Sequence, residues 1–247
     1  MSPLKLLRAL LALCIVPFLT LVVSLVSYAD VHWWRKSSTK ALQFPRLWGK
    51  VTCWFAGIDV QVEGRENLQP EETYIFVGNH TSQTDIMTFQ GYMPHDFRWI
   101  AKKELFAIPF FGAAMKAVKF IPIDRSRGRQ AVKSLNDAAQ RIAEGSSVLI
   151  FPEGTRSPDG RLQPFKTGAI MLAIKAGVPV VPVGFNGNYQ VLPKGSVLSR
   201  GGNVVLRIGQ PMPTKNFQAR DKQELALKLR EQVASLLDQC HKPLSPP

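Results

Sequence analysis

The sequence predicts an α/β domain that is preceded by an N-terminal hydrophobic helical membrane anchor. From about residue 59 onward, short apolar runs alternate with longer segments of helical periodicity, which is typical of α/β domains. Residues 9–29 contain no charged side chain. The length of 247 residues, 45% of them hydrophobic and 20% charged, suits one sizeable globular domain. We expect membrane-anchoring helices in residues 1–58, the main domain in 59–240 and a loose tail in 241–247.

The uncharged N-terminal run matches the thickness of a membrane. As a helix, residues 9–29 would be about 31 Å long, close to the hydrocarbon core of a bilayer. A signal peptide is the alternative, but its apolar region is usually shorter, and no cleavage site precedes the aromatic and basic residues 31–36. Pro17 would kink or break the helix, and a second apolar stretch, 42–58, has aromatic residues at helical spacing. A transmembrane span and a helix pair within one leaflet are both possible.

Basic residues are more frequent after the apolar run than before it. This distribution places the main domain on the cytoplasmic side of a membrane, with a bacterial inner membrane as the expected location. Over the whole chain, 31 Lys and Arg against 18 Asp and Glu give a net charge of +13. Such an excess indicates a nucleic acid, an anionic membrane surface or a phosphorylated substrate as partner. The uncharged apolar run at the N-terminus favours a membrane as the partner, and we expect no nucleic acid.

Motifs for several common chemistries are absent from the sequence. The three cysteines are far apart and form neither a disulfide framework nor a metal-binding pattern. The sequence lacks a serine-hydrolase elbow, a P-loop, a dinucleotide-binding glycine motif and an H-E-x-x-H zinc motif. We therefore expect no metal and no cofactor.

The elements of the main domain follow from periodicity and from the positions of Gly and Pro. We expect, in order, a strand at 73–77, a helix from about Ser82 to Pro94, a strand at 97–101, a helical segment at 106–118, a short strand at 120–123, a helix at 132–142, a strand at 148–151, a helix at 167–175, a strand at 178–185, a strand at 204–208 and a helix at 225–236. Pro179 and Pro182 predict that strand 178–185 lies at an edge or is irregular.

The segment 79–85 directly follows the first of these strands, where α/β proteins collect ligand-binding and catalytic groups. His80 is the natural proton acceptor at neutral pH, and Asp85 can fix its tautomer. The two side chains can meet if His80 lies in the turn and Asp85 lies in the first turn of the helix. The alternative is structural, because Ser82 and Asp85 also match a capping box. The other histidines carry no functional prediction.

Two basic segments are candidates for binding an anionic head group. Lys102 lies in a charged run that is followed by the apolar stretch 105–112. Arg125 is the first of three arginines within residues 125–129. Guanidinium groups bind phosphate in a bidentate geometry, so the second segment is a candidate phosphate clamp. Both segments can equally be ordinary solvated turns.

The segment 151–157, Phe-Pro-Glu-Gly-Thr-Arg-Ser, leaves a predicted strand and enters a constrained turn. Such a turn projects Arg156 from a rigid backbone, which suits a binding site more than simple solvation does. An ordinary surface loop, in which Pro and Gly only shape the turn, is the alternative.

In their order and spacing, these segments resemble the glycerolipid acyltransferases typified by 1-acylglycerol-3-phosphate acyltransferase. The resemblance rests on N-H-x-S-x-x-D at 79–85, I-D-R at 123–125, F-P-E-G-T-R-S at 151–157 and a V-P-[VI] run at 178–183. It covers roughly residues 60–210. It implies a single acyltransferase domain with a mixed sheet flanked by helices.

The resemblance also implies a reaction in phospholipid biosynthesis. His80, held by Asp85, would take the proton from the free hydroxyl of a lysophospholipid. That oxygen would attack the thioester of acyl-CoA or acyl-acyl-carrier protein, which gives phosphatidate when the acceptor is 1-acylglycerol-3-phosphate. The implied substrate-binding residues are Lys102, Arg125, Glu153, Gly154, Thr155 and Arg156. The basic ones would neutralise the phosphate, and Glu153 would orient Arg156 or contact the glycerol.

Two other functions remain open at this point. One is the same chemistry on another lysolipid, such as lyso-ornithine lipid, although the net charge of +13 favours an anionic acceptor. The other is a non-catalytic protein that binds anionic lipid at the membrane surface. A protein of that kind would not need both His80 and Asp85.

Overall fold

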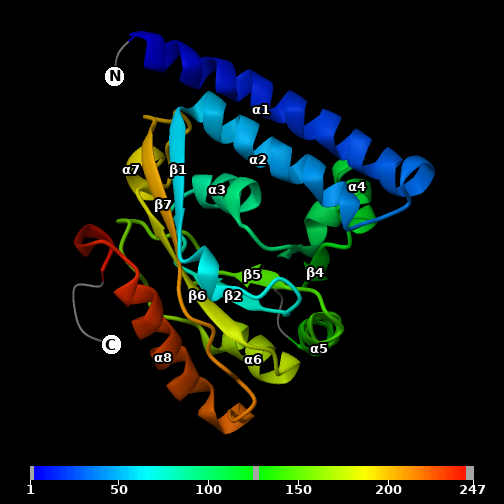
Figure 1. Ribbon diagram of the computed structural model, residues 1–247, viewed down its shortest axis with the longest axis vertical. Helices are drawn as coiled ribbons and strands as arrows, with labels where there is room; N and C mark the ends of the chain where they lie inside the picture. Colours follow the sequence, from blue (N-terminus) through cyan, green and yellow to red (C-terminus); the bar gives the residue numbers. More distant parts are fainter. Residues whose placement is uncertain (1–2, 125–127, 243–247) are drawn as a thin grey trace.

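The computed structural model describes residues 3–124 and 128–242, and within this part a seven-stranded mixed sheet carries the fold (Figure 1). The strands are β1 (Ile58–Glu63), β2 (Ile75–Gly78), β3 (Arg98–Lys102), β4 (Ile121–Ile123), β5 (Val148–Ile150), β6 (Val180–Asn186) and β7 (Gly202–Ile208). Their order is β1-β7-β6-β2-β5-β3-β4. The β6–β7 pair is antiparallel and the other neighbours are parallel. The predicted mixed sheet flanked by helices is confirmed.

Helices cover both faces of the sheet. They are α1 (Pro3–Ala29), α2 (Gln43–Ala56), α3 (Thr84–Tyr92), α4 (Phe111–Ala117), α5 (Arg129–Ala143), α6 (Thr167–Ala176), α7 (Asn188–Val191) and α8 (Lys222–Ser235). In strand β2, Ile75 and Val77 belong to the core formed with α5, α6 and α8. Phe76 belongs to the opposite core, where it meets Phe89 of α3. The strand is buried on both faces, as central parallel strands usually are.

The strand predicted at 178–185 does not lie at an edge, because β6 lies inside the sheet between β7 and β2. The irregularity predicted as the alternative is present on its β7 side. All seven of its residues are buried. Pro182 is tolerated there because it precedes the regular ladder with β7, which begins at the pair Val183–Ile208. Toward the N-terminus, the Pro182 carbonyl accepts the Gly209 N–H at 2.8 Å, and an isolated bridge joins Val180 to Met212. Pro182, which has no N–H group, thus falls in an irregular stretch.

Strand β1 was not among the predicted elements, although the sequence contained a signal for it. Its apolar residues Ile58, Val60 and Val62 alternate with polar ones, which is the period of a half-buried strand. It pairs in parallel with β7 at the edge of the sheet. The border expected after residue 58 therefore falls just inside a strand.

Helix α1 continues through Pro17 as a single helix and ends in a π-helical turn, Asp30–Trp34. Within the described residues, Leu6–Trp34 is long and apolar enough to cross a membrane. Helix α2 runs back along α1 (Figure 1), and the Trp48 indole N–H of α2 donates to Thr20 Oγ1 of α1 at 2.9 Å.

Helix α2 also packs closely on α3 of the main domain. A Cβ atom on Gly49 of α2 would lie 2.4 Å from the backbone nitrogen of Gly91 in α3, so the two backbones are in direct contact. Thr52 and Cys53 are fully buried in the same region. Helix α2 is therefore held by the main domain on one side and covered by α1 on the other.

The C-terminal segment is held in place as far as residue 242. His241, expected in a loose tail, is buried, and its ring bridges two loops. Its Nδ1 donates to the Gly160 carbonyl at 2.9 Å, and its Nε2 accepts from the Gly187 N–H at 3.3 Å. Residues 243–247 lie outside the described part.

Candidate active site

His80 and Asp85 meet in the way that their spacing allows. His80 lies in the turn after β2, and Asp85 is the second residue of α3. The His80 Nδ1 atom lies 2.8 Å from Asp85 Oδ2. The side chain of Asp85 is fully buried, whereas that of His80 is 17% exposed. A neutral imidazole that donates from Nδ1 has Nε2 as its proton acceptor.

Asp85 also orders the turn that carries the histidine. Its Oδ2 accepts the backbone N–H groups of Thr81 and Ser82 at 2.8 and 2.9 Å. Asp85 thus satisfies two backbone N–H groups in the turn before α3 and binds the imidazole with the same oxygen.

Neighbouring residues hold the His80 ring and its turn from other sides. The ring stacks on Phe151, with centroids 4.1 Å apart and planes within 12°. The Asn79 side chain exchanges two hydrogen bonds with the backbone of Phe185 in β6, at 2.8 and 3.0 Å. The imidazole is therefore held in one orientation before any substrate binds.

The turn of residues 151–157 follows β5 and is bound to the backbone of His80 at two points. The buried Glu153 accepts the His80 N–H with Oε1 at 2.6 Å and the Gln163 N–H with Oε2 at 3.2 Å. The Ser157 N–H donates to the His80 carbonyl at 2.7 Å. Burial raises the pKa of Glu153 to about 8, against the opposing effect of the two N–H donors.

These contacts do not include Arg156, whose orientation was one of the two roles expected for Glu153. Within the described residues, its oxygens bind backbone N–H groups, and the structure shows no ion pair between Glu153 and Arg156. Glu153 lies beside the backbone of His80. The carboxyl group thus joins the turn 151–157 to the backbone of His80.

Of the predicted cationic residues that the structure describes, Lys102 is exposed, whereas Arg156 is half-buried like His80. Arg156 is half-buried and makes no ion pair with the residues that the structure describes. Gly154 and Thr155 are exposed, and Gly154 has a φ of +76°, which favours glycine at this point of the turn. Lys102, at the end of β3, lies 3.7 Å from the exposed carboxylate of Glu104. Arg125 lies outside the described residues.

The topology explains why distant segments lie at the same edge of the sheet. Strands β2, β5 and β3 are parallel neighbours, so their carboxyl ends lie at the same edge of the sheet. His80 follows β2, the turn 151–157 follows β5, and Lys102 ends β3. Ligand sites form at this edge in α/β sheets.

One element of the site was not predicted at all. The segment 187–194 follows β6, which is also parallel to β2 and ends at the same edge. The Ser82 hydroxyl donates to the Leu192 carbonyl at 2.7 Å, and the Lys194 ammonium donates to the Arg156 carbonyl at 2.9 Å. The position of segment 187–194 after a central strand was the only sequence signal for its part in the site, because its contacts are with residues far away in the sequence.

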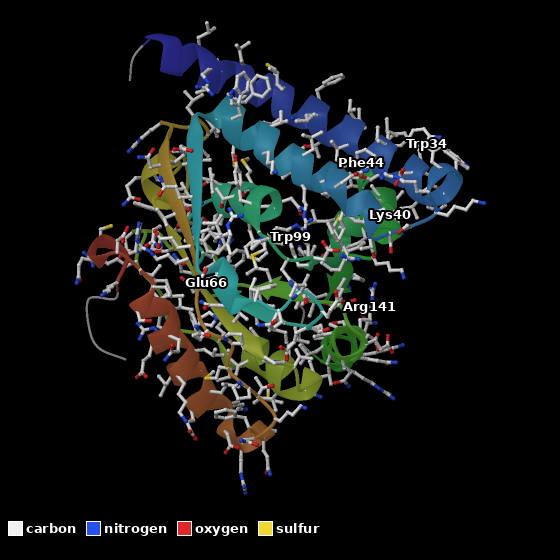
Figure 2. All side chains as sticks on the ribbon, viewed as in Figure 1. Trp34, Lys40, Phe44, Glu66, Trp99 and Arg141 are labelled. Carbon is white, nitrogen blue, oxygen red and sulfur yellow. The ribbon has the colours of Figure 1, made fainter. Side chains whose placement is uncertain are left out.

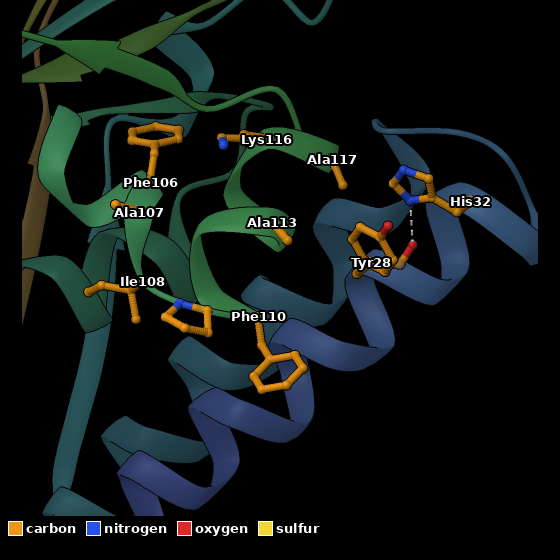
Figure 3. A pocket seen from close by; sticks show the side chains of 10 residues that line it. Tyr28, His32, Phe106, Ala107, Ile108, Phe110, Ala113, Lys116 and Ala117 are labelled. Atoms are coloured by element: carbon orange, nitrogen blue, oxygen red, sulfur yellow. Dashed lines mark hydrogen bonds between the residues drawn. The ribbon is translucent and has the colours of Figure 1, made fainter.

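A cavity of about 480 Å³ lies between the end of α1 and helix α4 with the segment that precedes it (Figure 3). Its lining is mostly apolar and comprises Tyr28, His32, Phe106, Ala107, Ile108, Pro109, Phe110, Ala113, Lys116 and Ala117. It is thus formed by the apolar stretch predicted beside Lys102 together with the end of the N-terminal helix. None of the residues around His80 lines it. Within the described part of the chain, no group of three or more His, Cys, Asp or Glu side chains is placed to hold a metal ion.

Comparison with known proteins identifies the class of this domain. The sequence profile of the acyltransferase family matches residues 59–186. The crystal structure of the 1-acyl-sn-glycerophosphate (LPA) acyltransferase PlsC from Thermotoga maritima is similar, with a TM-score of 0.74 and 30% sequence identity. That match covers 93% of this chain and 97% of the Thermotoga chain.

Sequence relatives agree. A 1-acyl-sn-glycerol-3-phosphate acyltransferase from Pseudomonas aeruginosa is 34% identical over 183 residues, which are 72% of this chain and 70% of that protein. A chloroplastic enzyme of the same name from Brassica napus is 39% identical over 170 residues, which are 68% of this chain but 48% of the relative. The chain spans about half the length of the Brassica and Arabidopsis chloroplast relatives. It belongs to the 1-acylglycerol-3-phosphate acyltransferase family.

Proposed function

We propose that this protein transfers an acyl group from acyl-CoA or acyl-acyl-carrier protein to the free hydroxyl of 1-acylglycerol-3-phosphate and so forms phosphatidate. The observation that carries this proposal is the His80–Asp85 hydrogen bond of 2.8 Å, in a chain of this family. The fully buried Asp85 gives the imidazole one tautomer, and the His80 side chain remains 17% exposed, so a substrate hydroxyl can reach it.

In the proposed reaction, His80 acts as general base. Its Nε2 takes the proton from the acceptor hydroxyl, while Nδ1 keeps its hydrogen bond to Asp85. The hydroxyl oxygen attacks the thioester carbonyl, and the tetrahedral intermediate then collapses. The new ester C–O bond remains, the C–S bond breaks, and the imidazolium returns its proton to the leaving thiolate. Much of the acceleration comes from holding the two substrates in register.

Positive charges beside the histidine support a phosphate-bearing acceptor. Arg156 lies on the turn that is hydrogen-bonded to His80 through Ser157 and Glu153. Its guanidinium is free of ion pairs within the described residues and can bind a phosphate group. We assign Arg156 and Lys102 to the phosphate, with Gly154 and Thr155 shaping the turn, and we retain Arg125 as a further candidate from its position in the sequence.

The proposed acceptor is amphiphilic, and the N-terminal helices provide a surface for it. Trp33 and Trp34, at the turn between α1 and α2, are 68% and 64% exposed, and Figure 2 shows Trp34 at this end of the molecule. Ile108 and Phe110, beside the cavity in Figure 3, are also exposed. Keeping the acyl chain out of water matters, because each exposed CH₂ costs about 0.8 kcal/mol. We propose that α1 and these side chains enter the bilayer, with the sheet on the cytoplasmic side of a bacterial inner membrane.

A direct assay tests this function. The full chain, purified in detergent micelles, is supplied with a radiolabelled acyl thioester of either carrier and with 1-oleoyl-lysophosphatidate. We expect labelled phosphatidate from the parent protein and almost none from the His80→Ala variant. Restored growth of cells that lack their own phosphatidate-forming acyltransferase is the matching test in vivo. Labelling of another lysolipid in preference to lysophosphatidate would refute the proposed acceptor.

A further inference from the structure

The segment 187–194 connects the two parts of the candidate site, although it belongs to none of the motifs that identify the family. On one side, Asn188 Nδ2 lies 3.1 Å from Thr84 Oγ1 in α3, and the Leu192 carbonyl accepts from the Ser82 hydroxyl at 2.7 Å. On the other side, the Tyr189 hydroxyl donates to the Pro158 carbonyl at 3.0 Å. The segment is thus bound both to the His80 turn and to the loop that carries Arg156.

Lys194 lies at the tip of a tight turn at the end of this segment. The Ser196 N–H donates to the Pro193 carbonyl at 3.0 Å, and Gly195 has a φ of +92°, so the turn is well defined. The base of the turn is anchored, because Val191 and Leu192 are buried. Lys194 is therefore an exposed lysine on a rigid backbone.

The Lys194 ammonium points back toward the arginine turn. It donates to the carbonyl oxygen of Arg156 at 2.9 Å. An ammonium has three N–H donors, so two remain for a ligand. Within the described residues, neither Lys194 nor Arg156 forms an ion pair with a carboxylate. The ammonium thus lies at the backbone of the residue whose guanidinium is proposed to bind phosphate, and a phosphate bound at this turn would be attracted by both cations.

We propose that Lys194 is a phosphate-binding residue of the acceptor site and favours acceptors that carry a phosphate monoester. A monoester carries close to two negative charges at neutral pH, whereas a phosphodiester carries one. A second cation next to Arg156 therefore stabilises the monoester more. This inference rests on the proposed function and adds to it the residue that distinguishes lysophosphatidate from lysolipids with larger head groups.

Three substitutions separate the charge from the hydrogen bond. Lys194→Arg keeps both, Lys194→Gln keeps a donor for the Arg156 carbonyl but loses the charge, and Lys194→Ala loses both. The matched control is Lys215→Ala, which removes the same charge from an exposed lysine in the loop after β7. The full-length proteins are assayed in detergent micelles with an oleoyl thioester and with 1-oleoyl-lysophosphatidate or 1-oleoyl-lysophosphatidylglycerol as acceptor.

We expect the KM for lysophosphatidate to rise about tenfold in Lys194→Ala and Lys194→Gln, which is the usual effect of losing one hydrogen bond to a charged group. The kcat and the KM for the thioester should stay within about threefold of the parent values, as with loss of a binding contact. The preference for lysophosphatidate over lysophosphatidylglycerol should shrink in both variants. Lys194→Arg and Lys215→Ala should behave like the parent protein.

Several results would overturn the inference. If Lys194→Gln works as well as Lys194→Arg, the residue serves only to hold the Arg156 carbonyl. An unchanged KM for lysophosphatidate in Lys194→Ala, or an equal rise for both acceptors, also refutes it while leaving the proposed function intact. A parent protein that does not acylate lysophosphatidate refutes both proposals together.

Discussion

The two parts of the candidate site are built in opposite ways. The histidine part is buried and closely hydrogen-bonded: Asp85 accepts three N–H groups, and the His80 ring is stacked on Phe151. The cationic part is open, with Lys102 and Lys194 exposed and Arg156 half-buried. The turn 151–157 joins them, because Glu153 and Ser157 bind the histidine backbone and Arg156 lies on the same turn.

This difference follows from what each part has to do. Proton transfer requires an imidazole within hydrogen-bond reach of the acceptor hydroxyl in the right orientation, and that favours a rigid surrounding. Recognition of a phosphate requires charged groups that can adjust their position to a ligand arriving from a membrane. Long basic side chains on a rigid backbone can make this adjustment. Four variants test the contrast, from the largest expected effect to the smallest.

The His80→Ala substitution removes the centre of the rigid part. Loss of a general base should lower turnover by about 10²–10⁴-fold. Thermal unfolding should change little, because the partly exposed ring contributes little to the core. Steady-state assays on lysophosphatidate, with the melting temperature as the control for folding, measure both effects. Turnover within about threefold of the parent would show that His80 is not the base.

The Arg156→Lys substitution tests the open part. Lysine keeps the charge but loses the planar fork that binds phosphate through two N–H groups. We expect the KM for lysophosphatidate to rise about tenfold, the free-energy equivalent of about 1.4 kcal/mol. The KM for the thioester should change far less. Arg220→Lys, on an exposed turn before α8, is the matched control. Equal weakening toward both substrates would assign Arg156 to the fold or to the donor.

Replacing Trp33 and Trp34 by Ala extends the test to the membrane surface. Both indoles are exposed at the end of α1, where tryptophan commonly marks a bilayer interface. We expect less sedimentation with anionic vesicles and several-fold lower activity on vesicle-embedded acceptor. Activity on a short-chain, water-soluble acceptor should persist. Leu227→Ala, which removes an exposed apolar residue of α8, should have neither effect. Loss of activity on both acceptors would contradict a docking role.

The Glu153→Gln substitution tests the joint between the two parts. Burial raises the pKa of Glu153 from 4.5 to about 8. Between these values the folded state keeps a proton that the unfolded state has lost, so the contribution to stability falls as the pH rises. The variant lacks this titration, and its melting temperature should depend less on pH from about 5 to 8.

Melting curves of the parent protein and of Glu153→Gln from about pH 5 to 8 check the sign of this pH dependence. The substitution Glu231→Gln, at an exposed position, is the control. A parent protein whose stability rises more steeply with pH than that of Glu153→Gln would show that Glu153 is held as a carboxylate. Glutamine can still accept one of the two N–H groups, so the fold should survive the substitution.

Periodicity and local motifs predicted the parts of the fold that depend on near neighbours. The strand before Gly78, the helix that carries Val132 and Ile142, and the meeting of His80 with Asp85 all follow from spacing within a few residues. The placement of β6 could not be predicted this way. Proline restricts a strand locally, but whether its missing N–H matters depends on the partner opposite, here the irregular stretch before Met212.

The sequence by itself determined the class of protein, the histidine pair and the apolar N-terminal helix, because each is encoded in contiguous or closely spaced residues. Only the tertiary structure decided how the site is assembled. It placed the Glu153 carboxyl group at the backbone N–H of His80, brought Lys194 to the Arg156 carbonyl across 38 residues of sequence and buried His241 between two loops. The physical reason is that these are contacts between strand ends and loops, whose partners are chosen by the order of the strands in the sheet.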